Sequence, residues 1–133
     1  MAITTSDRMV MLWRGLTRRC PRCESGGLFR HWVEMVDDCP RCGLIFEREE
    51  GYWLGAIYLN TFFTGAVLTL LLAVVGVLSW PHIPMTPMIA IGLPLGGALP
   101  ILFYPSCKTF WLAIDLCFLH PLRPWRRRRR EQD

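Results

Sequence analysis

The chain has 133 residues, of which 52% are hydrophobic and 20% charged, and its formal net charge is +4. This length leaves room for about one domain. The charges are confined to the two ends of the chain, and Asp, Glu, Lys and Arg are absent between Trp53 and Pro105. So long an uncharged, apolar stretch excludes an ordinary small soluble domain and indicates segments that span a membrane.

The N-terminal segment is basic and carries no signal peptide. Its apolar run, Met9 to Trp13, is too short for the hydrophobic part of a signal peptide, and Arg14, Arg18 and Arg19 follow it. We therefore expect residues 1–50 to stay attached to the rest of the chain.

Two Cys-Pro-Arg-Cys sequences come next, in the pattern Cys20-x2-Cys23-x15-Cys39-x2-Cys42. This spacing is typical of a zinc site with four thiolate ligands. Each turn lets two thiolates face one ion, and Gly43 after the second pair tolerates a positive φ. Glu24 stands at the matching place after the first pair, so we expect Ser25-Gly26-Gly27 to absorb that turn instead.

Other uses of four cysteines are open. A disulfide would suit an exported domain, but the charge distribution places these cysteines in a reducing compartment. A redox Cys-x-x-Cys normally occurs once, beside a βαβ pattern that is missing here. Iron in a rubredoxin-like site is chemically compatible with the same ligands. We favour structural zinc over iron, and four thiolates leave no position for water and so argue against metal hydrolysis.

The residues around the second pair predict two short β-strands. Leu28 to Val36 alternates in the manner of a strand, and Leu44 to Arg48 is its expected partner. Two cysteine turns with short strands form a zinc ribbon. Because so small a unit buries little core, the metal would supply the missing stability, on the order of 10 kcal/mol. The prediction for residues 1–50 is a small cytoplasmic β zinc ribbon with a leading basic segment.

The uncharged stretch divides at residues 79–87, where three prolines would interrupt a helix in lipid. Residues 51–105 therefore predict a hairpin of two transmembrane helices, about 53–80 and 85–104, the second kinked by its own prolines. Gly92-x-x-x-Gly96 could mark helix pairing in a homo-oligomer, and we favour packing within one chain. For Asn60, the most polar residue of the first span, we expect a hydrogen bond between helices.

The last segment, residues 106–133, predicts an amphipathic helix, which either lies in the membrane interface or packs on the spans, and a polybasic tail. Its apolar part, residues 110–119, is too short to cross a membrane. Residues 1–50 hold eight Arg and the loop between the spans holds no Lys or Arg, so both termini are expected in the cytoplasm and the chain in the inner (plasma) membrane. Five consecutive arginines are expected to bind anionic lipid headgroups: Arg126, Arg127, Arg128, Arg129 and Arg130.

Candidate contacts with a partner protein are Arg22, Trp32, Arg41 and Asp115, because Arg and aromatic side chains dominate interfaces and an acid within apolar sequence at membrane depth is a functional candidate. For Asp115 we favour the alternative of a headgroup-level helix, on which Lys108 shares its face. Eight acidic residues balance the eight arginines of residues 1–50, which argues against nucleic acid. No set of nucleophile, base and oxyanion donors is found, so we expect no enzyme.

The chain resembles the bacterial membrane proteins grouped as the domain-of-unknown-function family numbered 983. The motifs that carry the resemblance are Arg14-Gly15-Leu16, Arg19-Cys20-Pro21-Arg22-Cys23, Gly27-Leu28-Phe29, Cys39-x-x-Cys42-Gly43-Leu44 and Glu50-Gly51, followed by two spans. The resemblance covers roughly residues 12–105 and departs at Glu24, where members tend to have Gly. It implies an inner-membrane protein of unassigned activity with a role in assembly of a membrane complex such as a respiratory oxidase. We expect a docking or accessory module, and the alternative is a metal or redox carrier that works through the cysteine pairs.

Overall fold

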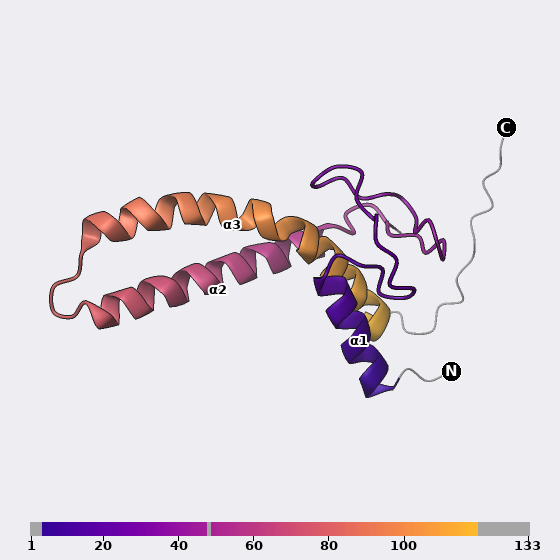
Figure 1. Cartoon of the computed structure of the whole chain (residues 1–133), viewed down its shortest axis with the longest axis horizontal. Coiled ribbons are helices and arrows are strands. Elements are labelled where there is room, and N and C mark those ends of the chain that lie inside the picture. Colours follow the sequence, from indigo (N-terminus) through magenta and orange to yellow (C-terminus); the bar gives the residue numbers. More distant parts are fainter. Residues whose placement is uncertain (1–3, 48, 120–133) are drawn as a thin grey trace.

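The computed structural model describes residues 4–47 and 49–119. They form three α-helices, α1 (Thr5–Leu16), α2 (Leu54–Leu78) and α3 (Met85–Ile114), and α3 passes directly into a short π-helical segment, η1 (Asp115–Leu119). Figure 1 shows α2 and α3 side by side as a long hairpin, with α1 beside the C-terminal part of α3. The cysteine-containing segment lies at the same end of the molecule as α1, away from the hairpin turn (Figure 1).

Both helices of the hairpin are long and apolar enough to cross a membrane, α3 together with η1. At 1.5 Å per residue, the 25 residues of α2 extend about 37 Å, which exceeds the roughly 30 Å of a bilayer's hydrocarbon core. The most apolar part of each helix contains no buried residue, so its side chains are available to lipid. The predicted pair of membrane-length helices is therefore present.

The turn between the two helices lies where the sequence predicted it. α2 ends at Leu78 and α3 begins at Met85, close to the expected helices at about 53–80 and 85–104. Pro87, the last residue of the proline-rich stretch, occupies the first turn of α3. A proline is tolerated there because the first N–H groups of a helix have no partner within the helix.

The two glycines of the Gly-x-x-x-Gly motif face the neighbouring helix of the same chain. A Cβ atom added at Gly96 would lie 3.4 Å from Leu68, and one added at Gly92 would lie 3.7 Å from Leu72. These are ordinary van der Waals distances, so both glycines lie at the contact between α3 and α2. The favoured interpretation, packing within one chain, agrees with this arrangement.

Asn60 links the two membrane-length helices through its side chain. Its Nδ2 donates a hydrogen bond to the Pro100 carbonyl at 3.0 Å, and the Cys107 thiol lies 3.8 Å from its Oδ1. The side chain is almost fully buried. The prediction that Asn60 makes a hydrogen bond between helices is confirmed.

The helix of the second predicted span extends beyond its expected end, and the described residues contain no separate interfacial helix after it. α3 continues without interruption past Tyr104 and through Pro105 to Ile114. A proline within a helix removes one N–H donor, here the one that would serve the Ile101 carbonyl. The Trp32 indole N–H supplies the missing donor at 3.0 Å, which lets the helix continue. The predicted polybasic tail, Arg126 to Arg130, lies outside the described residues.

Residues expected as a leading basic segment form the helix α1. Thr4 and Asp7 cap its N-terminus reciprocally: the Thr4 backbone N–H donates to the Asp7 carboxylate at 3.1 Å, and the Asp7 N–H donates to Thr4 Oγ1 at 3.3 Å. At the other end of α1, Gly15 is buried against α3, where the Thr109 hydroxyl donates to the Gly15 carbonyl. The helix is therefore fixed at both ends.

The predicted β zinc ribbon is wrong, because the described residues contain no β-strand. Only two isolated β-bridges occur, between Phe29 and Met35 and between Asp38 and Ile45. The chain bends sharply at residues 30–33, and this bend reaches across to α3 instead of extending the pairing. The first pairing therefore stops after a single bridge, and the second encloses the turn of Cys39 to Cys42, so the cysteine segment is an irregular structure joined to a helical protein.

The core lies where the cysteine segment meets α3. Its buried residues are Cys20, Leu28, Cys39, Leu44, Phe46 and Leu112. All but Leu112 come from the cysteine segment, and Leu112 comes from the C-terminal part of α3. The cysteine segment therefore completes its small core with a residue of the helical hairpin.

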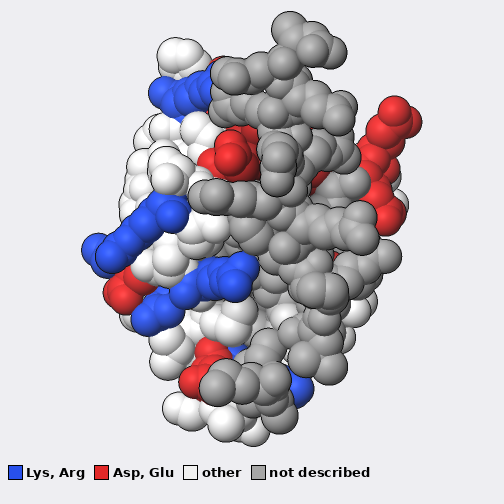
Figure 2. Space-filling model, turned by 90° about the vertical axis from the view of Figure 1, so that its right-hand side faces the viewer, with Lys and Arg blue, Asp and Glu red and all other residues white. Residues whose placement is uncertain are grey.

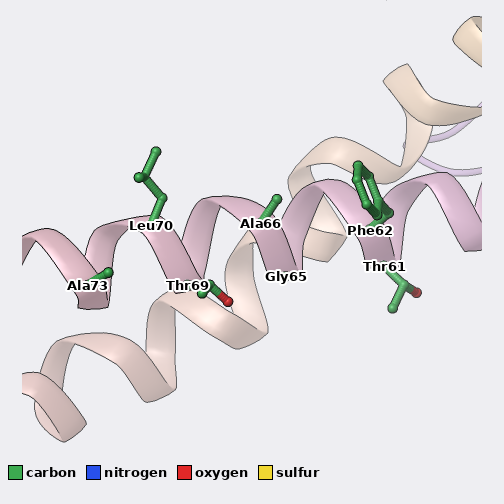
Figure 3. A pocket seen from close by; sticks show the side chains of 7 residues that line it. All are labelled: Thr61, Phe62, Gly65, Ala66, Thr69, Leu70 and Ala73. Atoms are coloured by element: carbon green, nitrogen blue, oxygen red, sulfur yellow. The ribbon is translucent and has the colours of Figure 1, made fainter.

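A shallow, exposed groove runs along the outer side of α2. Its lining residues are Thr61, Phe62, Gly65, Ala66, Thr69, Leu70 and Ala73. In Figure 3 the small residues Gly65 and Ala66 leave a shallow depression between the larger side chains of Phe62 and Leu70. All of the lining is uncharged and lies in the membrane-length part of α2, so this groove suits acyl chains and offers no group for chemistry.

Candidate metal centre

The two Cys-Pro-Arg-Cys turns are built by the same pair of backbone hydrogen bonds. In the first turn the Cys20 carbonyl accepts from the Glu24 N–H at 2.9 Å, and in the second the Cys39 carbonyl accepts from the Gly43 N–H at 2.7 Å. In each turn the N–H of the first cysteine also donates to a carbonyl five residues later, Cys20 to Ser25 at 3.0 Å and Cys39 to Leu44 at 2.9 Å. The chain thus presents two matching turns, one from each cysteine pair.

The residue after each pair has a left-handed backbone. Gly43 has φ of 67°, as its lack of a side chain predicted, and Glu24 has φ of 62° at the matching place. The expectation that the following residues would absorb the first turn is therefore wrong. A side chain in this conformation costs roughly 1 kcal/mol, and Glu24 uses its carboxylate to form ion pairs with Arg14 at 3.1 Å and with Arg19 at 3.5 Å.

The four sulfur atoms converge on one point. The Sγ atoms of Cys20, Cys23, Cys39 and Cys42 all lie within 4.8 Å of one another, a group that could hold a metal ion. Cys20 and Cys42 have their sulfurs 3.8 Å apart, and Cys23 and Cys39 have theirs 3.6 Å apart. Four thiolates placed tetrahedrally about 2.3 Å from a metal would be separated by about 3.8 Å. The observed spacing therefore fits a tetrahedral tetrathiolate site.

Each pair contributes one buried and one partly exposed ligand. Cys20 and Cys39 are 0% and 1% exposed, whereas Cys23 and Cys42 are half-buried. The buried sulfurs rest against the core formed with Leu112. One side of the site is thus closed by apolar packing, and the other side faces the surface.

Burial and the backbone of the turns shift the pKa values of the cysteine thiols. Burial opposes ionisation of Cys39, but backbone N–H groups of Cys42 and Arg41 point at its sulfur and lower its pKa to about 6. Burial raises the pKa of Cys20 and of Cys42. One thiolate is therefore ready at neutral pH, and a metal must displace protons from other ligands as it binds.

A tetrahedral set of four thiolates suits zinc or iron and leaves no open position on the metal. Within the described residues, this is the one group of His, Cys, Asp or Glu side chains with metal-binding geometry. The remaining two cysteines, Cys107 and Cys117, lie buried in α3 and η1. The donor set therefore favours a structural centre, and it does not by itself decide between zinc and iron.

The four predicted partner contacts fall into two groups. Arg22 and Arg41 sit at corresponding positions within the two cysteine turns, and both are exposed. Trp32 is half-exposed but is docked on α3 through its indole N–H. Asp115 is 2% exposed and accepts a hydrogen bond from the Tyr52 hydroxyl at 3.1 Å. Arg22, Arg41 and Trp32 are therefore exposed enough to contact a partner, whereas Asp115 is not.

Two basic residues near Trp32 were not predicted as functional. Arg18 donates to α3, and Lys108 of α3 donates to the carbonyl of Val33 at 3.0 Å. In the folded chain both lie beside the C-terminal part of α3, where the long uncharged stretch ends. For Lys108 a sequence indication did exist, because it is the first charge after the spans. The position of Arg18 depends on how α1 packs, which its sequence neighbours do not reveal.

Comparison with protein families matches residues 29–115 to a family described as a protein of unknown function, DUF983. The match covers well over half of the chain, so the chain belongs to this family and the resemblance seen in its sequence is confirmed. The matched range includes Cys39, Cys42 and both membrane-length helices, and it begins after the first cysteine pair. No curated protein and no solved structure matches the chain.

Proposed function

We propose that this member of the DUF983 family is a membrane-anchored docking or accessory protein whose four-cysteine centre holds one structural zinc ion. The observation that carries the proposal is the convergence of four sulfurs from two matching turns. Such a closed donor set gives a fixed shape and no position for substrate. A respiratory oxidase or a similar membrane complex is the kind of assembly that the family resemblance suggests.

We further propose that α2 and α3 span the plasma membrane with both chain termini in the cytoplasm. The support is the arginine asymmetry: residues 1–50 carry eight Arg, and the turn between the helices carries neither Arg nor Lys. A reporter that works only in the cytoplasm should be active when fused after Asp133 and inactive when inserted near His82. The reverse pattern would overturn the orientation and the reducing environment of the cysteines.

The partner is expected to meet the outer side of the cysteine turns. Arg22 and Arg41 are exposed there, and arginine is enriched at the centres of protein interfaces. Figure 2 shows basic and acidic side chains intermixed on the end of the molecule that carries this segment. A mixed surface suits a protein partner better than nucleic acid, which favours a basic face. A closed metal site also supports the proposal that the protein is not an enzyme.

Capture of a partner from detergent-solubilised membranes tests this function. Changing Arg22 and Arg41 together to Glu should keep the metal and membrane insertion but reduce the captured partner. Arg30→Glu is the matched control, because Arg30 is exposed and lies outside both turns. Equal loss of partner from the control would show a general charge effect, and undiminished capture by the double variant would refute docking through the turns.

A second candidate function is metal or redox transfer, and the partial exposure of Cys23 and Cys42 favours it. A carrier must release its metal or change its oxidation state, whereas a structural centre keeps one zinc ion tightly. Exchange of bound metal with a labelled zinc isotope separates the two. Slow exchange, without any change in oxidation state, supports the docking function.

A further inference from the structure

The bend at residues 30–33, which we name the tip, is docked on α3. The Trp32 indole N–H donates to the Ile101 carbonyl at 3.0 Å, and Lys108 Nζ donates to the Val33 carbonyl at 3.0 Å. Figure 1 shows this part of the cysteine segment reaching back over α3 toward the helical hairpin. The tip therefore lies beside the last turns of a membrane-length helix.

Two basic side chains flank the tip. Arg18 donates from Nε to Ser106 at 3.0 Å and from a terminal nitrogen to the Leu102 carbonyl at 3.2 Å, and its guanidinium lies 5.0 Å from the Trp32 ring. The Lys108 ammonium lies 4.7 Å from the Trp53 ring and 5.2 Å from the Tyr104 ring. Because each aromatic ring stabilises its cation, both charges are held in place.

The tip stands at the depth where the apolar surface ends. Ile101, Leu102 and Phe103 are 62%, 51% and 44% exposed and belong to the charge-free stretch that stops at Lys108. In a bilayer these three side chains face acyl chains. Trp32 is 50% exposed and Val33 is 40% exposed at the same level, so apolar surface continues from the helix onto the tip.

We propose that the tip is a membrane-interface anchor in which Trp32 and Val33 enter the headgroup region while Arg18 and Lys108 bind the phosphate of an anionic phospholipid. Indole rings favour this region, where one edge is apolar and the other polar. Two cations beside an apolar surface match an anionic headgroup in charge and depth. This inference rests on membrane insertion of α2 and α3, which is one part of the proposed function, and it does not depend on any protein partner.

The chemistry of the two cations favours an anionic lipid over a zwitterionic one. The Lys108 ammonium has three N–H donors, of which the Val33 carbonyl takes one, and an arginine stays charged at any physiological pH. Each basic residue close to an anionic membrane surface strengthens binding roughly fivefold. We therefore expect Arg18 and Lys108 together to favour an anionic headgroup by roughly 25-fold.

Depth-dependent fluorescence quenching tests the position of Trp32. The full chain is placed in phosphatidylcholine nanodiscs containing phosphatidylglycerol, and the emission lost in Trp32→Phe gives the contribution of Trp32. A nitroxide at the lipid headgroup should quench this contribution more strongly than either a nitroxide at the acyl-chain end or iodide in the buffer. Strongest quenching by iodide would place Trp32 in water and overturn the anchor.

Lipid binding to delipidated protein tests the cations. Bound phosphatidylglycerol and phosphatidylcholine are measured by native mass spectrometry for Arg18→Gln, Lys108→Gln and the double variant. The preference for phosphatidylglycerol should fall roughly fivefold in each single variant and roughly 25-fold in the double variant. Arg41→Gln is the matched control, because Arg41 is exposed and lies outside the tip.

Two charge-conserving variants distinguish a loss of lipid binding from a loss of folding. Arg18→Lys and Lys108→Arg should keep most of the preference, and metal content should be unchanged in every variant compared. An unchanged preference in the double Gln variant would overturn the headgroup site, even if the protein still captured its partner. A lost partner with an intact lipid preference would instead count against the docking function alone.

Discussion

Gly15 marks the closest approach of α1 to α3, so Gly15→Ala tests how firmly the two helices are joined. The added Cβ would lie 2.7 Å from the Ala113 Cβ and 2.8 Å from the Thr109 carbonyl oxygen. Carbon atoms in contact are about 3.5–4.0 Å apart, so α1 must retreat by about 1 Å. One of the two obstructing groups is backbone, which cannot rotate out of the way.

The cost of this shift has two parts. Overpacking a close contact costs roughly 1–3 kcal/mol, and lengthening the hydrogen bond from the Thr109 hydroxyl to the Gly15 carbonyl costs about 1 kcal/mol. The better helix propensity of alanine returns at most about 1 kcal/mol. We therefore expect the free energy of unfolding to fall by roughly 1–3 kcal/mol.

Denaturant unfolding of the detergent-solubilised protein, followed by tryptophan fluorescence, measures this difference. Gly97→Ala is the matched control, because a Cβ added at this helical glycine meets no atom within 4 Å. The control should unfold at the wild-type midpoint or slightly above it. If Gly15→Ala behaved like the control, α1 would not be packed on α3 as described.

Three further predictions concern the metal centre. Cys39→Ser should lose the bound metal while Cys107→Ser, which changes a thiol outside the cluster, should retain it; equal metal contents by elemental analysis would contradict the four-cysteine site. Zinc affinity, measured by competition with a chelator, should weaken as pH falls, because burial raises the pKa of Cys20 and Cys42 and protons then compete for these sulfurs; a pH-independent affinity would contradict this. The free energy of unfolding of Glu24→Gly, measured with denaturant, should exceed that of Glu24→Gln by roughly 1 kcal/mol, since both variants lose the ion pairs but only glycine relieves the left-handed backbone. The opposite order would show that the backbone there is not strained.

The membrane-length hairpin and the cysteine cluster were predictable from sequence because each depends on short-range patterns. A charge-free stretch divided by prolines predicts two spans in any surroundings, and the spacing of four cysteines limits how they can converge. Asn60 was predictable for the same reason, since a polar side chain within a span needs a partner on a neighbouring helix.

The errors arose where distant residues decide the local structure. The end of α3 was misplaced because the helix continues through Pro105, where the Ile101 carbonyl accepts a hydrogen bond from Trp32, a residue far away in sequence. The strands were predicted from an alternating pattern, but the bend at residues 30–33 serves the contact with α3. The helix α1 was missed although its Thr4–Asp7 capping box is a local sequence signal, whereas its packing on α3 through Gly15 is a long-range contact that the local sequence does not reveal.

The place of Leu112 in the core of the cysteine segment has a consequence for the order of events during synthesis. Phe46 and the four cysteines leave the ribosome before both spans, and Leu112 leaves after them. At about 5–20 residues per second, Leu112 follows Phe46 by roughly 3–13 seconds. Throughout this interval the four thiols are already synthesised but the apolar residue that packs behind them is missing, so closure of this core comes last.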